Sequence, residues 1–273
     1  MTVIASNISA LRASNASTSA QMALSTSMQR LSTGSRINSA KDDAAGLAIS
    51  ASMTSQIKGM NQGIRNANDG ISMAQTAEGA LDEVTNNLQR MRELEVQKSN
   101  GTYSTDDIAN IEAEQDALAS QITDVLTNTK FNGTALFAGT AGTTGVVTVQ
   151  AGANTTDAID LDLGGNLLTT DGVEDVVTAG AASGASIEDY DTAIANISTR
   201  RASLGASQNQ LQSAVNNLTS NSTNLSDARS RIQDTDYSSE TTALAKAQIL
   251  AQASTAMLSQ ANQSTQSVLK LLQ

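Results

Sequence analysis

The sequence has 273 residues and a formal net charge of −11, and it contains no histidine, cysteine or proline. The lack of histidine and cysteine argues against a zinc, haem or thiol enzyme, and the negative charge disfavours nucleic acid, because phosphate binding needs clustered Lys and Arg. With only three tyrosines and two phenylalanines, the chain lacks the bulk for a globular core, so the composition predicts a thin, elongated molecule.

The first 40 residues predict an amphipathic helix followed by a connecting segment. Apolar side chains recur at Ile4, Ile8 and Leu11 among many Ala, Ser and Asn residues. Short side chains bury little area each, so this helix is expected to be marginal alone. The opening residues lack the charged, apolar and cleavage regions of a secretory signal, which predicts that any export uses a route without a cleaved signal peptide.

The stretch LSTGSRINSAKDDAAGLAIS, residues 31–50, permits two interpretations. A phosphate-binding loop would need a Lys-Ser or Lys-Thr pair, whereas Lys41 precedes Asp42, whose charge repels phosphate. A bend before a new helix fits better, because capping residues and acids precede an apolar run. Its predicted members are Gly34 at the bend, Asn38 or Ser39 as the cap, and Asp42 and Asp43 in the first helical turn.

Residues 41–130 are predicted to form two antiparallel coiled-coil helices. No proline interrupts the first helix, whose apolar residues follow alternating steps of four and three from Met53 to Leu88, before Asn100-Gly101 ends it. The second helix is expected to start with Ser104 or Thr105 as the cap and with Asp106 and Asp107 in the first turn.

Residues 131–185 break the helical pattern and hold ten of the eighteen glycines. Short alternating runs such as VVTVQ and AIDLDL predict small β-hairpins and loops, and Asn132-Gly133 after Phe131 is a strong hairpin-turn signal. The Gly and Thr content also permits a disordered linker beyond residue 138.

A third long helix is predicted for residues 186–235, with Ser186 as its cap, and at about 1.5 Å per residue it would run roughly 70 Å. Three matched stripes predict a mainly α fold, an elongated coiled-coil rod with paired terminal helices and a small β-hairpin region. Polar positions within the stripes would fix the register. They are Gln115, Arg201, Gln208 and Ser222.

Residues 236–273 predict a second terminal helix made mostly of small residues. The two terminal stripes have no other partner in the chain except each other, so both are expected to order by packing against neighbouring copies. The predicted packing residues are Ile4, Ile8 and Leu11 at one end and Leu250, Met257, Val268 and Leu271 at the other.

Three adjacent acidic pairs could suggest catalytic carboxylates. Each pair lies at or near a predicted helix start, where acids are expected because they favour the helix dipole. The sequence therefore predicts no catalytic, cofactor-binding or metal site. The pairs are Asp42-Asp43, Asp106-Asp107 and Glu188-Asp189.

Several long segments occur in an order that identifies a family resemblance. They are LSTGSRINSAKDDAAGLAI (31–49), RNANDGISMAQTAEGAL (65–81), LQRMRELEVQ (88–97), FNG (131–133) and AKAQILAQASTAMLSQANQSTQSVLKLL (245–272). Together they closely resemble bacterial flagellin. The resemblance implies a terminal coiled-coil domain that lines a filament core and a helical rod domain outside it. Because the insertion is short, it also implies little or no outer domain.

The resemblance implies five regions along the chain. They are an N-terminal core helix and spoke (1–40), rod-domain helices (41–130), a short β-hairpin and loop insertion (131–185), a long rod helix (186–235) and a C-terminal core helix (236–273).

The resemblance implies a structural subunit, not an enzyme, that self-assembles into the extracellular flagellar filament used for motility. Implied partners are other copies, the filament cap, hook-junction proteins and an export chaperone, without nucleic acid or membrane insertion. A hook-filament junction protein and a non-filamentous coiled-coil scaffold are the alternatives.

Two residue sets also follow from the resemblance. The spoke is expected to contact adjacent subunits through Gly34, Arg36, Lys41, Asp42 and Asp43. A face recognised by an animal innate immune receptor, and used primarily for rod packing, would comprise Arg90, Leu94 and Glu114.

Overall fold

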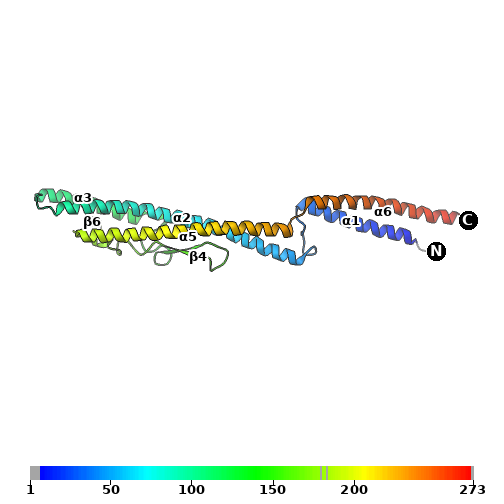
Figure 1. Ribbon diagram of the computed structural model, residues 1–273, viewed down its shortest axis with the longest axis horizontal. Helices are drawn as coiled ribbons and strands as arrows, with labels where there is room; N and C mark the ends of the chain where they lie inside the picture. The colour runs from blue at the N-terminus through cyan, green and yellow to red at the C-terminus, as the bar shows by residue number, and fades with distance from the viewer. Residues whose placement is uncertain (1–6, 179, 183, 272–273) are drawn as a thin grey trace. The chain divides into compact units, whose positions relative to one another are not determined.

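The computed structural model describes residues 7–178, 180–182 and 184–271, with the side chains of the last helix described as far as Ser264. The predicted fold class, mainly α with paired terminal helices and small β-hairpins, is confirmed (Figure 1). The helices are α1 (Ile8–Thr33), α2 (Ala44–Lys98), α3 (Thr105–Asn128), α4 (Val173–Val176), α5 (Ile187–Gln233) and α6 (Tyr237–Leu271). The antiparallel strand pairs are β1 (Lys130–Phe131) with β2 (Thr134–Ala135), β3 (Val146–Gln150) with β4 (Ala158–Asp162), and β5 (Val177–Thr178) with β6 (Ala181–Ala182).

The chain divides into two compact units. We call residues 1–55 and 224–273 the terminal unit and residues 56–223 the central unit. The division falls inside α2 and α5, which are continuous helices that contribute to both units. The region boundaries predicted from the sequence lie instead near helix ends, because capping residues and glycines mark where a helix ends. A change of packing partners within a continuous helix leaves no such mark in the sequence.

Capping and turn chemistry fix the ends of the elements in the central unit. Ser104 and Asp107 form a reciprocal capping box at the start of α3, and Ser186 with Asp189 does the same at α5. Asn132, with φ of 47°, and the following glycine form the turn between β1 and β2. These three predictions from the sequence are confirmed.

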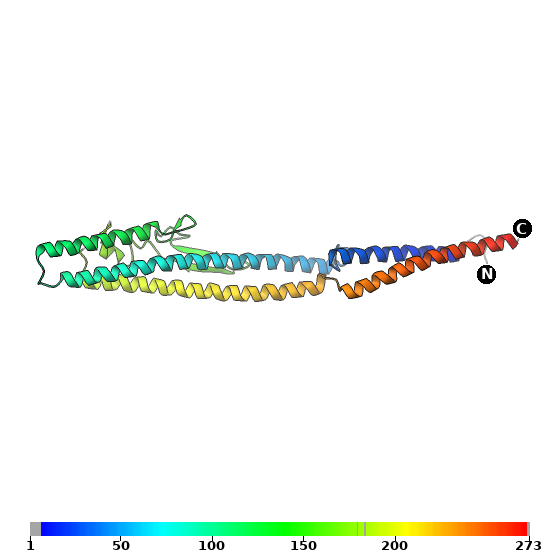
Figure 2. The same cartoon turned by 90° about the horizontal axis from the view of Figure 1, so that it is seen from above.

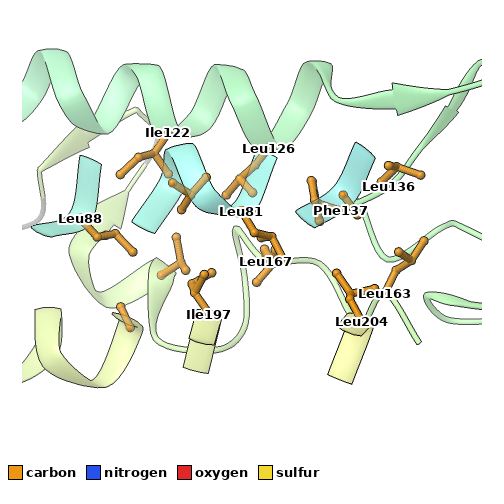
Figure 3. Close-up of a cluster of buried hydrophobic side chains, with 14 of the residues drawn as sticks. Leu81, Leu88, Ile122, Leu126, Leu136, Phe137, Leu163, Leu167, Ile197 and Leu204 are labelled. Atoms are coloured by element: carbon orange, nitrogen blue, oxygen red, sulfur yellow. The ribbon is translucent and has the colours of Figure 1, made fainter. Parts of the chain in front are cut away.

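The core of the central unit joins three helices to the insertion. In Figure 2, α2 and α5 run side by side and α3 folds back along α2. The apolar stripes of these helices meet, and insertion residues fill the remaining space (Figure 3). None of the labelled side chains is more than 2% exposed. They are Leu81 and Leu88 of α2, Ile122 and Leu126 of α3, Ile197 and Leu204 of α5, and Leu136, Phe137, Leu163 and Leu167 of the insertion.

The polar positions predicted within the stripes all bond to α2. Gln115 of α3 is only 2% exposed, and its Nε2 donates to the Met91 carbonyl at 3.3 Å and to Glu95 at 3.0 Å. Polar bonds at single positions of a coiled coil favour one register over the alternatives. On α5 the bonds are Arg201 to Asp82 at 2.9 Å, Gln208 to Glu78 at 2.8 Å and Ser222 to Asn61 at 3.2 Å.

The insertion packs directly on the helices. A Cβ atom at Gly63 of α2 would lie 2.8 Å from the backbone of Ala151, so only glycine allows this close approach of the segment that follows β3. At the other end of the hairpin, Arg200 of α5 donates to the Leu163 carbonyl and forms an ion pair with Asp171. Residues 131–178 are therefore an integral part of the central unit, which favours the predicted hairpins over a disordered linker.

We expect Leu81→Ala to lower the free energy of unfolding of the monomer by about 3 kcal/mol, because it leaves a cavity in the core. Leu250→Ala is the matched control, since Leu250 is 47% exposed, and it should change stability by less than about 0.5 kcal/mol. Urea unfolding followed by circular dichroism measures both values. Equal losses in the two variants would contradict the burial described above.

Candidate functional site

The terminal unit contains a helix pair with a seam of short side chains. α1 and α6 lie side by side in both views (Figures 1 and 2). The side-chain amide of Asn7 donates to the Ala261 carbonyl at 3.1 Å, and Arg30 pairs with Glu240 at 3.6 Å. Short side chains let the helices approach closely, but each buries little apolar area. The buried residues of the seam are Ala20, Ser27, Ala247, Ser254 and Ala261.

Large apolar side chains of the same helices remain outside the seam. Of the predicted packing residues, Ile8, Leu11, Leu250 and Met257 are 52%, 64%, 47% and 63% exposed. Ile4 lies outside the described residues, as do the side chains of Val268 and Leu271. Contiguous exposed apolar patches usually mark protein-protein contacts, so these side chains are candidate contact residues. The sequence pattern missed two further exposed residues, Met22 and Ile249, which lie off the apolar steps of the two helices.

An open groove runs along the seam of the pair. Its volume is about 420 Å³, and Ala16, Ala20 and Ala23 of α1 face Ala243 and Ala247 of α6 across it. Lys246 contributes the charged group in the lining of this groove. A side chain from another helix can enter such a groove without displacing a large residue.

None of the helices in the described part of the chain is long and apolar enough to cross a membrane.

The two linkers of the terminal unit are hydrogen-bonded to each other. Gly34 ends α1 with φ of 69°, a left-handed conformation that favours glycine. Its carbonyl accepts from Thr235 N at 3.0 Å, while Arg36 N donates to the Gln233 carbonyl at 2.6 Å. The Arg36 guanidinium also donates to the Ile232 carbonyl at 2.7 Å. The linkers between α1 and α2 and between α5 and α6 are therefore clipped together.

Asp42 and Asp43 hold the second half of the first linker. Asp42 accepts from the backbone N–H of Asn38 at 3.1 Å and of Ser39 at 2.9 Å, which closes a separate turn. Asp43 accepts from Gly46 N at 2.8 Å and so caps α2. The prediction that Asn38 or Ser39 caps the helix is wrong, because α2 begins only at residue 44 and has no acid in its first turn.

The predicted spoke residues thus divide into two groups. Gly34, Arg36, Asp42 and Asp43 bond within the chain, and only Lys41 is exposed without a hydrogen bond or ion pair among the described residues. The sequence interpretation missed the contribution of the other linker, residues 234–236, because a partner distant in the sequence leaves no local signal.

The rod face predicted from the resemblance is only partly exposed. Arg90 donates to Glu114 through Nη2 at 2.8 Å and through Nε at 3.0 Å, and it also bonds to Glu93. The side chains of Arg90 and Glu114 are about half exposed. Leu94, in contrast, is 2% exposed. The face that another protein could contact in the free chain therefore contains Arg90 and Glu114 but not Leu94.

Comparison with known proteins relates these features to a family. The family model "Bacterial flagellin N-terminal helical region" matches residues 4–142, and "Bacterial flagellin C-terminal helical region" matches residues 187–272. The chain is 42% identical to a flagellin of Xenorhabdus nematophila over an alignment of 312 positions, gaps included, and this match covers 99% of each protein. It is 41% identical to a flagellar filament 33 kDa core protein of Treponema phagedenis, again covering 99% of each.

A solved structure shares the fold at low sequence identity. It is described as a putative flagellar hook-associated protein from Vibrio parahaemolyticus, is 18% identical, and gives a TM-score of 0.57. The match covers 71% of this chain and 100% of the other. At this identity the likeness concerns the fold alone.

Protonation of Asp42 should open the linker turn at acid pH. Hydrogen bonds from the Asn38 and Ser39 backbones and from the Ser39 hydroxyl lower the pKa of Asp42 below its ordinary 3.8. The carboxylate therefore supports the turn fully above pH 3.8, and this support is lost as pH falls through the lowered pKa. We expect the Ser39 amide resonance to shift with a midpoint below pH 3.8, and Asp42→Asn to abolish that shift. A midpoint at or above pH 3.8 would contradict the assigned bonds.

Proposed function

This chain belongs to the bacterial flagellin family and is a structural subunit of the flagellar filament, and from this premise we propose how its surfaces build that filament. The single observation that carries the proposal is the exposure of large apolar side chains on α1 and α6, which their own seam leaves uncovered. We propose that α1 and α6 of neighbouring copies cover these side chains in the filament core.

The contacts proposed for the core are heterologous, because the exposed residues differ from the seam that would receive them. Leu11 and Met257 are exposed outside the open groove, whose lining consists of alanines and serines of α1 and α6 together with Lys246 and Leu250. A contact between two different surfaces repeats without closing and generates a helical polymer. A closed coiled-coil scaffold of fixed size would instead need a self-complementary face.

The clipped linkers are proposed as the spoke. Their bonds join residues 34–36 to residues 232–235, so the two linkers are held together as one segment of the terminal unit. Lys41, which is exposed, is proposed to contact an adjacent subunit. The Arg90–Glu114 pair is proposed to belong to the lateral packing face of the central unit.

We further propose the partners that meet the chain before and after growth. An export chaperone would cover the exposed apolar residues of α6, such as Ile249 and Leu250, while the chain is unassembled. The filament cap and the hook-junction proteins would meet the same helices at the two filament ends.

Export is proposed to proceed through the growing structure as an unfolded chain without a cleaved signal peptide. The composition suits this route, because the chain contains neither proline nor cysteine. Refolding at the tip then involves no slow X–Pro isomerisation and no disulfide formation. We also propose that the protein has no catalytic activity, since the three predicted acidic pairs lie at helix starts or in the linker turn.

Replacing the exposed apolar residues should impair assembly without unfolding the monomer. Burial of one such side chain contributes roughly 1.5–3 kcal/mol, and each 1.4 kcal/mol is a tenfold change in an equilibrium constant. We expect Leu250→Ala/Met257→Ala to raise the critical monomer concentration for growth on sheared filament seeds at least tenfold. Gln252→Ala, on the same helix, is the control and should change it less than threefold. Electron microscopy and sedimentation measure both, and an unchanged critical concentration in the double variant would contradict the proposed core contacts.

A further inference from the structure

The helix pair of α1 and α6 carries positive charge in an otherwise acidic protein. Across Ile8–Thr33 and Tyr237–Leu271 the sequence has one acidic residue, Glu240, and it is paired with Arg30 at 3.6 Å. Arg12 and Lys246 form no hydrogen bond or ion pair with any residue that the structure describes. The whole chain has a net charge of −11. This helix pair therefore attracts anions, whereas most of the molecule repels them.

The groove along the seam combines an apolar floor with one cation. Its volume of about 420 Å³ is that of a pocket for a small ligand. Alanines form most of the floor, Leu250 adds a large apolar side chain, and Lys246 is the charged residue of the lining. The lining on α1 runs from Ala16 to Ser27, which is roughly 16 Å at about 1.5 Å per residue. A long, narrow ligand with an apolar body fits this groove better than a compact one.

Two buried serines of the groove have unpaired hydroxyl groups. Ser27 is 5% exposed and Ser254 is 8% exposed, and both line the groove. Neither hydroxyl forms a hydrogen bond within the part of the chain that the structure describes. A buried polar group without a partner costs free energy, which a polar atom of a ligand recovers by bonding to it. The groove therefore offers hydrogen-bond donors as well as apolar surface.

Lys246 and Ser27 lie toward the same end of the groove. The two helices run antiparallel, and the Arg30–Glu240 ion pair marks one end of their seam. Ser27 is about one helical turn from Arg30, and Lys246 is less than about two turns from Glu240. A carboxylate at this end can accept a hydrogen bond from the Ser27 hydroxyl and a charge-assisted one from the Lys246 ammonium. The apolar floor then extends away from that carboxylate.

We propose that the groove of the unassembled chain binds a single-chain anionic amphiphile, such as a long-chain fatty acid. The carboxylate lies at Lys246 and Ser27, and the acyl chain covers the alanine floor and excludes water from it. A neutral ligand would leave Lys246 unpaired, and a nucleic acid would leave the apolar floor uncovered. Under the filament role proposed above, neighbouring copies need the same surface, so amphiphile binding and polymerisation exclude each other.

Isothermal titration calorimetry of the full-length monomer with dodecanoate, below its micellar concentration, tests the site. We expect saturable binding of one molecule per chain. Ala16→Leu/Ala23→Leu fills the groove from two exposed positions and should weaken binding at least tenfold. Ala245→Leu/Ala256→Leu adds the same bulk at exposed positions outside the lining and should bind within twofold of wild type. Absence of saturable binding to the wild type, or equal weakening in the two variants, would overturn the proposal.

Dodecanol, a neutral ligand of equal chain length, tests the charge at the groove. Lys246→Gln should weaken dodecanoate binding about threefold, because exposed ion pairs are weak, and should leave dodecanol binding unchanged. Arg12→Gln removes a cation of the same helix pair that does not line the groove, and it should leave the binding of both ligands unchanged. Equal effects of the two variants on dodecanoate would contradict the position assigned to the carboxylate.

A membrane surface is the other source of anionic acyl chains. Binding of the monomer to phosphatidylglycerol vesicles without binding of free dodecanoate would overturn the proposal, because the groove would then not hold a single chain. These measurements use the monomer alone. Their failure therefore leaves the filament role intact, and a failure of the wild type to extend filament seeds would leave the binding result intact.

Discussion

The seam between α1 and α6 is the constraint on which the rest of the structure depends. It is built from alanines and serines, so it holds two helices close together, but it fully buries none of the large apolar side chains described on them and leaves most of these exposed. Leu11, Met22, Ile249 and Met257 are all more than 60% exposed as a result. A single chain cannot correct this, because no third element of the terminal unit lies over these residues in the described structure. The covering surface must come from another molecule, and repetition of that requirement produces a polymer.

The central unit meets the opposite requirement, since it must hold its shape without a partner. Its three long helices and the insertion enclose large side chains such as Leu81, Phe137 and Tyr190, each at most 1% exposed. Four polar bonds to α2 fix the register, and Arg200 attaches the insertion loop to α5. A subunit that is stable in one unit and incomplete in the other can be stored as a monomer and still polymerise.

The helices and their caps could be predicted from the sequence because their signals are local. Heptad steps located α2, α3 and α5, and Ser104 and Ser186 marked two helix starts correctly. The division into two units could not be predicted, because it falls within continuous helices whose pattern does not change there. The linker turn could not be predicted either, because Asp42 can cap either a helix or a separate turn. The hydrogen bonds to residues 232–235, which are distant in the sequence, favour the separate turn.

The candidate site was predictable in kind but not in every residue. The apolar steps along α6 include Leu250 and Met257, which are exposed. The same steps also include Ala247, Ser254 and Ala261, which are buried in the seam. A periodic stripe does not say which of its members face the partner helix and which face solvent. The family resemblance likewise pointed to Leu94, whose burial became evident only from the packing of the central unit.

Hydrogen exchange measured by mass spectrometry on the monomer and on assembled filaments tests the central claim most directly. The account predicts slow exchange in the central unit in both states, because its core is complete in one chain. It predicts that α1 and α6 exchange much faster than α2 in the dilute monomer, since a seam of short side chains opens at low cost, and become protected only in the filament. Protection of α1 and α6 in the dilute monomer as strong as that of α2 would show that the terminal unit is complete by itself and would contradict the account.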